Sequence, residues 1–298
     1  MNSRNKKQPV LVVAHDAGGA EMLAAYVGAN SKKHQFDVYA AEPAFGIFRR
    51  EGVAAKKIAR SNLKKVINAH RDSSVLLGTG HPKSLELAAL KEAKKQGIPT
   101  VSYLDSWKRY RERFGYPSRG WKKNLPDKIW AGDRVAYALA RKCFPSIIVE
   151  RAPNFYFQNV RSRVKSTRRR EGAILFLSVA GNISFAVLEA ILLDYSSKKK
   201  SPEIIVRLHP LNDRRRFDAL ARSFHARVVL SDSDDIASDI SKAQVAIGGE
   251  TTALAVAAYS GLPAVCLWRA TVPLPFKGME RASSPKTAVR ILKKMLRD

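Results

Sequence analysis

Apolar and polar residues alternate along the chain in blocks that predict strands and helices in turn. Apolar runs of about four to eight residues predict strands, the first at 8–15, and segments with apolar residues on one side predict helices, the first at 19–30. In the first half, the further expected strands are 36–42, 74–80, 98–105 and 127–132, and the further expected helices are 62–70, 83–97 and 133–143. Continuous apolar strands between amphipathic helices are typical of parallel sheets covered on both faces.

The alternation pauses at residues 151–171, where a proline and a run of basic residues interrupt any regular period. It resumes with expected strands at 172–180, 203–208 and 226–231, expected helices at 184–196, 213–224 and 233–243, and a closing basic helix at 284–298. The sequence therefore predicts an N-terminal α/β domain over 1–150, a basic linker over 151–171 and a C-terminal α/β domain over 172–298. We expect two Rossmann-like, doubly wound domains that face a cleft.

The segment 244–263 has the pattern of a strand, a tight turn and a helix. Apolar residues at 245–247 predict the strand, and the turn and helix start follow at Gly248, Gly249, Glu250, Thr251 and Thr252. Amide groups at a helix start, helped by the helix dipole and two hydroxyls, form a site for phosphate. We expect Thr251 and Thr252 to hold that phosphate. Glu250 either accepts hydrogen bonds from a ribose or base, or only caps its helix.

Ligands of open α/β sheets bind beyond the carboxyl ends of the strands, so polar residues there are candidate site residues. In the C-terminal domain they include Gly181 after the first strand and His209 with Pro210 after the second. Pro210 favours an extended conformation at His209, whose imidazole could then donate to a phosphate or to a leaving group. The alternative is a histidine that is hydrogen-bonded within a turn.

The loop HDAGG occupies the equivalent position in the N-terminal domain. His15 and Asp16 are both candidates for a general base that deprotonates an acceptor hydroxyl. Asp16 could instead cap the helix that follows it. We predict no metal site, because the acidic run at 231–235 precedes a helix start, where aspartates serve as caps.

The net charge of +27, from 53 Lys and Arg against 26 Asp and Glu, is concentrated in one region. Residues 101–170 contain 18 basic and 5 acidic residues, whereas residues 201–250 contain 7 and 8. The basic segment 106–123, SWKRYRERFGYPSRGWKK, also contains aromatic residues, which suits a bilayer interface or a stacking surface for sugar or base. The alternative is a solvated loop with anchoring aromatics. The expected partner is an anionic glycan or a lipid-linked acceptor, and peripheral contact with an acidic membrane would also suit this charge.

The remaining composition favours a cytoplasmic protein, either free or held peripherally at the inner face of the membrane. Cys143 and Cys266 lie far apart without metal-ligand spacing, as expected of core thiols in a reducing compartment. No apolar stretch approaches the ~20 residues of a membrane span, and residues 1–9 lack the apolar core of a secretory signal. The high positive charge is the one feature that favours nucleic-acid binding. The sequence lacks RNA-recognition aromatics, zinc-ligand spacing and a helix-turn-helix, so we do not expect nucleic-acid binding.

His209-Pro210 and Thr251-Thr252 together resemble the motifs of bacterial GT-B glycosyltransferases of the sialyltransferase, polysialyltransferase and capsule-polymerase group. That resemblance implies a metal-independent transferase in surface-glycan biosynthesis, using a CMP- or CDP-linked sugar or polyol phosphate. In such an enzyme His209, Thr251 and Thr252 would bind the departing nucleotide phosphate. The acidic base motif of the group has HDAGG as its nearest counterpart here.

The segment IGGETTALAVAAYSGLPAV also resembles the glycine-rich C-terminal segment of non-hydrolysing UDP-N-acetylglucosamine 2-epimerases, which share the GT-B architecture. This second resemblance implies a UDP-linked substrate and no further cofactor. Two alternatives from other classes are a basic nucleic-acid-binding protein and a non-catalytic partner subunit.

Overall fold

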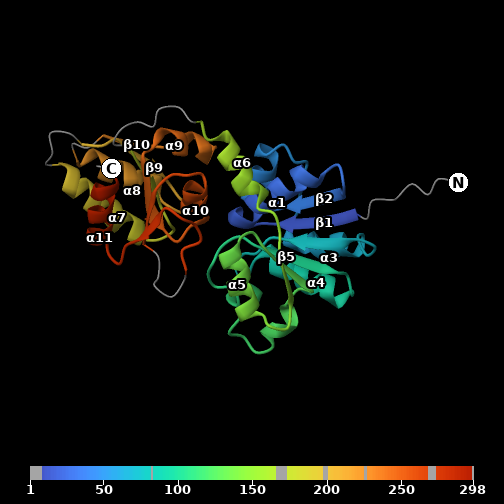
Figure 1. The fold of residues 1–298 in the computed structure, drawn as a ribbon. Helices are drawn as coiled ribbons and strands as arrows, with labels where there is room; N and C mark the ends of the chain where they lie inside the picture. The colour runs from blue at the N-terminus through green and yellow to red at the C-terminus, as the bar shows by residue number, and fades with distance from the viewer. Residues whose placement is uncertain are drawn as a thin grey trace. The chain divides into compact units, whose positions relative to one another are not determined.

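The computed structural model describes residues 9–81, 83–165, 173–196, 201–224, 227–267 and 273–296. The chain divides into two compact units, Met1–Tyr156 and Phe157–Asp298. Each unit is built on one parallel sheet with helices packed around it (Figure 1). The α/β class and the two Rossmann-like sheets agree with the prediction from the sequence.

The N-terminal unit contains a seven-stranded sheet of order β3-β2-β1-β4-β5-β6-β7. Its strands are β1 (Pro9–Ala14), β2 (Gln35–Ala40), β3 (Lys56–Lys57), β4 (Ser74–Leu77), β5 (Thr100–Leu104), β6 (Lys128–Ala131) and β7 (Ile148–Arg151). Its helices are α1 (Ala17–Asn30), α2 (Ala44–Arg50), α3 (Leu63–Asn68), α4 (Leu85–Lys95) and α5 (Arg134–Cys143), with 3₁₀ turns η1 (Arg60–Asn62), η2 (Glu112–Phe114) and η3 (Trp121–Asn124).

Both faces of this sheet are buried, which explains the nearly continuous apolar strands. Leu11 and Val13 of β1 pack in a cluster with apolar side chains of α3 and α4, and the alternate residue Val12 is also fully buried. The ring of Tyr26 on α1 contacts Trp130 of β6, the neighbour in sequence of Ile129, which belongs to that cluster. Because side chains alternate along a strand, α1 lies over the other face.

The C-terminal unit contains a six-stranded parallel sheet of order β10-β9-β8-β11-β12-β13. Its strands are β8 (Ile174–Leu177), β9 (Ile204–Arg207), β10 (Val228–Leu230), β11 (Val245–Gly249), β12 (Ala264–Leu267) and β13 (Met279–Arg281). Its helices are α7 (Ile183–Ser196), α8 (Arg214–Arg222), α9 (Ile236–Lys242), α10 (Thr252–Tyr259) and α11 (Pro285–Met295). Phe176, Val206 and Ile247 of the sheet pack with apolar residues of α7, α8 and α11.

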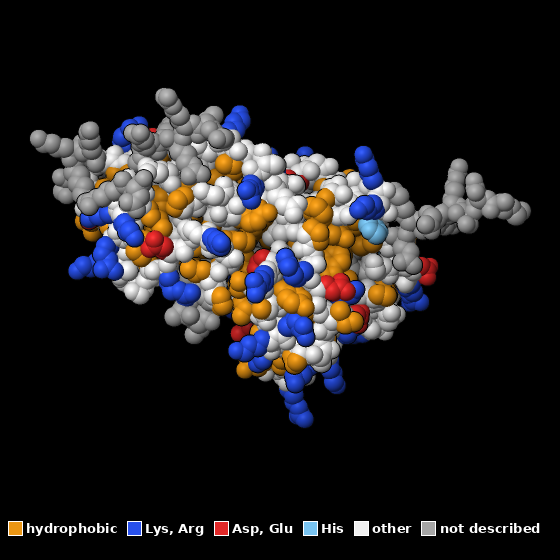
Figure 2. Space-filling view, viewed as in Figure 1, with side chains coloured by type: hydrophobic (Ala, Val, Ile, Leu, Met, Phe, Trp, Pro, Cys, Tyr) orange, Lys and Arg blue, Asp and Glu red, His pale blue; other side chains and the backbone are white. Residues whose placement is uncertain are grey.

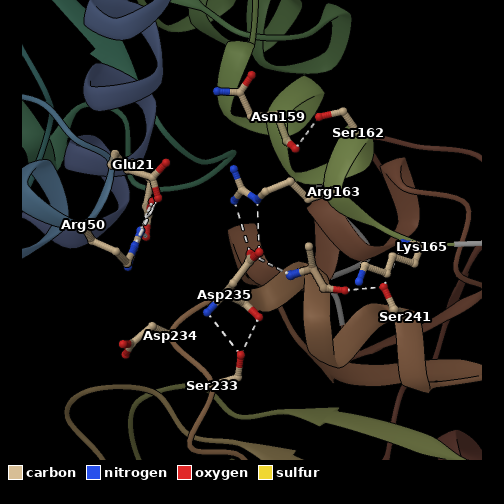
Figure 3. A network of polar contacts seen from close by, with 12 residues as sticks. Glu21, Arg50, Asn159, Ser162, Arg163, Lys165, Ser233, Asp234, Asp235 and Ser241 are labelled. Atoms are coloured by element: carbon tan, nitrogen blue, oxygen red, sulfur yellow. Dashed lines mark hydrogen bonds and ion pairs between the residues drawn. The ribbon is translucent and has the colours of Figure 1, made fainter.

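The segment 151–171, expected to be a linker without regular structure, contains helix α6 (Phe155–Arg163). Val160 is fully buried, and Arg163 donates two hydrogen bonds to Asp235, which caps α9 (Figure 3). Part of the expected linker, residues 166–171, lies outside the described residues. The short elements α2, β3, β7 and β13 were also not predicted.

Within the described residues, no helix is both long and apolar enough to cross a membrane. Lys and Arg side chains recur over the face shown in Figure 2, and Asp and Glu are fewer there. This distribution agrees with the high net charge of the sequence.

Candidate active site

The strand order of the C-terminal sheet switches between its central strands β8 and β11. The strand after β8 in the chain, β9, lies on one side of this pair, and the strand after β11, β12, lies on the other side. Such a switch in strand order leaves a crevice at the carboxyl edge, where α/β proteins bind ligands. The residues that follow the two strands lie together, because a Cβ added at Gly249 would be 2.7 Å from the Val179 side chain. The candidate residues after β8 and β11 therefore share one edge of this unit.

Gly248 and Gly249 are required by the packing of these strands. Gly248 is paired with Leu177 of β8, and a Cβ at Gly248 would lie only 2.4 Å from the Leu177 carbonyl oxygen. Gly181 has a left-handed backbone with φ +96°, which suits glycine in the turn before α7. The glycines thus keep this edge free of side chains, and the close contacts with Leu177 and Val179 explain the first two of them.

Thr251 caps α10, with its hydroxyl oxygen accepting a hydrogen bond from the Leu254 amide at 3.1 Å. The hydroxyl proton of Thr251 can still be donated to a phosphate oxygen. Glu250 and Thr252 flank the cap and are half-buried. The helix start predicted from the sequence is confirmed, with Thr251 outside the helix and Thr252 as its first residue.

His209 follows β9 and is held in a turn. Its amide donates to the buried Ser178 hydroxyl at 2.6 Å, and its Nδ1 accepts a hydrogen bond from the Leu211 amide at 3.2 Å. Because Nδ1 acts as an acceptor, Nε2 carries the proton of the neutral ring. Both the turn and the donor interpretation of the sequence are therefore compatible with His209, and Pro210 is exposed beside it.

The carboxyl edge of the N-terminal sheet contains a cluster of three carboxylates, one from each of Asp16, Glu86 and Asp105. Asp16 follows β1, where strand order switches between β1 and β4, and it caps α1 by accepting from the Gly18 amide at 3.1 Å. A Cβ at Gly18 would overlap the Asp105 carboxylate, so the first turn of α1 lies directly against Asp105. Of the three, Asp16 is half-buried and the other two are buried.

Glu86 holds the loop that carries His15 and Asp16. One of its carboxylate oxygens, Oε1, accepts hydrogen bonds from the amides of His15 at 2.6 Å and Asp16 at 2.8 Å. Its other oxygen and Nδ1 of His15 are buried and make no hydrogen bond to a described residue. The sequence did not single out Glu86, because its place in an amphipathic helix is that of an ordinary polar residue.

Arg113 neutralises part of the cluster from within the basic segment 106–123. Its Nη1 donates to Asp105 and to the Thr79 hydroxyl at 2.6 Å, and its Nη2 donates to the Ser106 hydroxyl at 2.5 Å. The Arg113 side chain is 13% exposed. This role could not be predicted from the sequence, where Arg113 is one of several basic residues in a charged run.

The pKa of Asp16 is raised above its ordinary value. The main cause is burial, and the negative charges of Asp105 and Glu86 add to it. The positive charge of Arg113 and the hydrogen bond from the Gly18 amide act in the opposite direction. A half-buried carboxyl with a raised pKa can take up and release a proton nearer to neutral pH than an exposed aspartate can.

Among the described residues, no group of three His, Cys, Asp or Glu side chains is arranged to hold a metal ion. The acidic run at 231–235 instead shows the cap expected from the sequence: Asp235 accepts from the Ala237 amide at 3.0 Å at the start of α9.

No protein-family model matches the chain, and no curated protein matches it. Solved structures do match, among them the complex of S. aureus MnaA with UDP, at a TM-score of 0.75, 13% identity, and coverage of 98% of this chain and 88% of MnaA. N. meningitidis UDP-GlcNAc 2-epimerase bound to UDP-GlcNAc matches at a TM-score of 0.67 and 16% identity, with 97% of this chain and 92% of the epimerase covered. Anabaena HepE in complex with UDP and glucose matches at a TM-score of 0.66 and 12% identity, with 98% of this chain and 90% of HepE covered.

These likenesses establish the GT-B-like fold of the chain, with two Rossmann-like domains. They agree in fold with the second resemblance found in the sequence, to the 2-epimerases. The resemblance to the sialyltransferase group stays a prediction.

Proposed function

We propose that the chain is an enzyme that acts on a UDP-linked sugar and moves a proton on that sugar, as a 2-epimerase does. The observation that carries the proposal is the half-buried Asp16 carboxyl with its raised pKa, at the ligand edge of the N-terminal sheet. The fold shared with MnaA in complex with UDP and with a 2-epimerase bound to UDP-GlcNAc supports the choice of nucleotide and sugar.

The C-terminal unit would bind the nucleotide. The start of α10 offers amide groups and the Thr251 hydroxyl to a phosphate, and Gly248 and Gly249 leave the approach open. His209 could donate from Nε2 to the same diphosphate, since its Nδ1 is already an acceptor. Thr252 remains the second hydroxyl of the phosphate site, and Glu250 would accept from the nucleoside.

The N-terminal unit would carry out the proton transfer. Inverting carbon 2 requires its proton to be removed, and the electron pair of the broken C–H bond would form a double bond to carbon 1 as UDP departs. The return of UDP to carbon 1 and of a proton to the opposite side of carbon 2 restores both bonds, so nothing is consumed overall. Asp16 can serve as the base or the acid, because its raised pKa makes both forms accessible. Glu86 Oε2 is a buried atom without a partner among the described residues, and it would provide a further proton acceptor in the same cluster.

Transfer of the sugar to an acceptor hydroxyl is the second candidate. One observation favours it: Asp16 is half-buried, whereas Glu86 and Asp105 are buried, and a glycosyl transfer needs only one base. In that reaction Asp16 or His15 would take the acceptor proton. His209, Thr251 and Thr252 would stabilise the charge that develops on the departing nucleotide.

Incubation with UDP-GlcNAc in deuterium oxide, followed by proton NMR, tests the proposal. An epimerase exchanges the hydrogen at carbon 2 for deuterium and produces a second UDP-sugar. A transferase leaves that hydrogen in place and releases UDP when an acceptor is supplied. We expect exchange in the wild-type protein and none in Asp16→Asn.

Binding is measured separately by the shift in melting temperature with UDP, because a ligand of the native state raises apparent stability. A protein that neither binds UDP nor turns over UDP-GlcNAc would contradict the proposal. Binding of UDP with exchange that is unchanged in Asp16→Asn would leave the nucleotide site in place and remove Asp16 from the mechanism.

A further inference from the structure

The basic segment 106–123 places three of its aromatic side chains inside and most of its basic side chains outside. Trp107, Tyr110 and Phe114 are buried at 5%, 4% and 2% exposure, so they anchor the segment to the core. The exposed basic residues are Lys108, Arg109, Arg111, Arg119, Lys122 and Lys123. A loop held by three buried rings presents its charges from a fixed base.

The end of α5 continues this surface. The Phe144 ring, directly after α5, lies 5.4 Å from the Phe114 ring and 6.4 Å from the Trp121 ring. Burial raises the pKa of the neighbouring Cys143 thiol, and the positive charges of Arg111 and Lys142 both oppose that shift. The ring contacts of Phe144 therefore bring the end of α5 against the basic segment, and both contribute charges to one surface.

We call this the basic surface, and it consists of Lys108, Arg109, Arg111, Arg119, Lys122, Lys123, Arg141 and Lys142. The two stretches that form it, 106–123 and 137–149, contain one acidic residue, Glu112. The ninth basic residue, Arg113, is turned inward to Asp105. The outward charge of the basic surface is thus almost entirely positive.

Exposed apolar groups lie within the same surface. The Tyr116 ring is 41% exposed and rests against Trp121 at 5.7 Å, and Ile148 is 61% exposed. Beside Ile148 is a recess of about 320 Å³, lined by Tyr137, Arg141, Phe144, Pro145, Ile147, Ile148 and Val149. Aromatic and aliphatic groups among basic residues suit the boundary between lipid headgroups and acyl chains.

We propose that the basic surface binds an anionic lipid bilayer, with its Lys and Arg side chains at the headgroups and with Tyr116 and Ile148 at the acyl boundary. The negative surface potential of an anionic membrane attracts Lys and Arg side chains, whatever substrate the enzyme binds. A nucleic acid would use the charges but not the exposed aliphatic Ile148. This proposal does not depend on the reaction that the enzyme catalyses.

Cosedimentation of the full chain with vesicles tests it, using phosphatidylcholine with and without phosphatidylglycerol. We expect binding only to the anionic vesicles. The triple variant Arg111→Gln, Lys122→Gln, Lys123→Gln should bind about 100-fold more weakly, since each charge near an anionic surface contributes about fivefold. Ile148→Ser should weaken the binding that persists at high salt, where charge is screened.

The matched control is Lys32→Gln, Lys33→Gln, Lys64→Gln, which removes three exposed charges from α3 and the turn after α1. It should bind anionic vesicles almost as well as the wild-type protein, and circular dichroism should show that both triple variants are folded. Equal losses in the two triple variants, or no wild-type binding to anionic vesicles, would overturn the proposal. Binding to an oligonucleotide but not to vesicles would overturn it in favour of nucleic acid.

Discussion

Arg113 reaches back to Asp105, eight residues earlier in the chain, and its guanidinium donates a hydrogen bond to the Asp105 carboxylate. The same guanidinium bonds the backbone oxygen of Thr79 at 3.0 Å, so one side chain joins the ends of β4 and β5. Its charge also lowers the pKa of Asp16, against the larger effect of burial. One residue of the basic segment thus sets both the geometry and the electrostatics of the carboxylate cluster.

Replacing Arg113 with Met should destabilise the protein by about 3 kcal/mol, because it removes a positive charge that is hydrogen-bonded to the buried Asp105 carboxylate. It should also raise the pKa of Asp16 further, since a positive charge has been removed. Urea unfolding measures the first effect and an NMR titration of the Asp16 side chain measures the second. Arg111→Met removes an exposed charge nearby and should change stability by less than about 0.5 kcal/mol.

Asp16→Asn should stabilise the folded protein at neutral pH while abolishing turnover. In the folded state the Asp16 pKa lies above the ordinary aspartate value of 3.8, so the folded form holds the proton more tightly than the unfolded form. The folded protein therefore loses stability as pH rises from 3.8 through the raised pKa of Asp16, and this loss of stability persists at higher pH. Asparagine keeps the cap of α1 without that cost.

Thermal melts of both proteins between weakly acidic and neutral pH give the comparison. The advantage of Asp16→Asn should be greatest at neutral pH and shrink as pH falls toward 3.8. An advantage that does not depend on pH would contradict the assignment of the raised pKa to Asp16.

Gly248→Ala should lower both stability and UDP binding. The new Cβ would lie 2.4 Å from the Leu177 carbonyl oxygen, so β11 must shift away from β8, at a cost of about 1–3 kcal/mol. Gly28→Ala is the matched control, because Gly28 lies in α1 with open space around it and alanine favours helices by about 0.5–1 kcal/mol. The two alanines should change the melting temperature in opposite directions, and equal shifts would contradict the strand contact.

Thr251→Ala should lower the free energy of unfolding by about 1 kcal/mol, because the Leu254 amide loses its cap. It should also weaken UDP binding, as the hydroxyl donor is removed. Thr251→Ser retains the hydroxyl and should restore both properties. Calorimetric titration with UDP separates binding from stability. Unchanged UDP affinity in a folded Thr251→Ala protein would remove Thr251 from the phosphate site.

The sequence predicted those parts of the site that depend on local signals. Asp16 and Thr251 both precede helices after apolar strands, and both are caps in the structure. The glycine pair before Thr251 also marked a tight turn. The pattern could not show that Leu177 and Val179 are the neighbours that leave no room for a Cβ at these two positions.

Residues that turn toward a distant loop could not be found in this way. Glu86 lies in the first turn of α4 and bonds amides 70 and 71 positions earlier, a contact set by the neighbouring positions of β1 and β4. The short helix α6 was missed because its apolar residues, at 155–157 and at 160, are too few to establish a helical period.

The inward turn of Arg113 makes the basic segment a point of thermodynamic linkage. Its outer charges face solvent while this one arginine lowers the proton affinity of Asp16. A partner that binds the outer charges and draws Arg113 away from Asp105 would increase the proton affinity of Asp16. By reciprocity, protonation of Asp16 would then favour that bound state to the same extent.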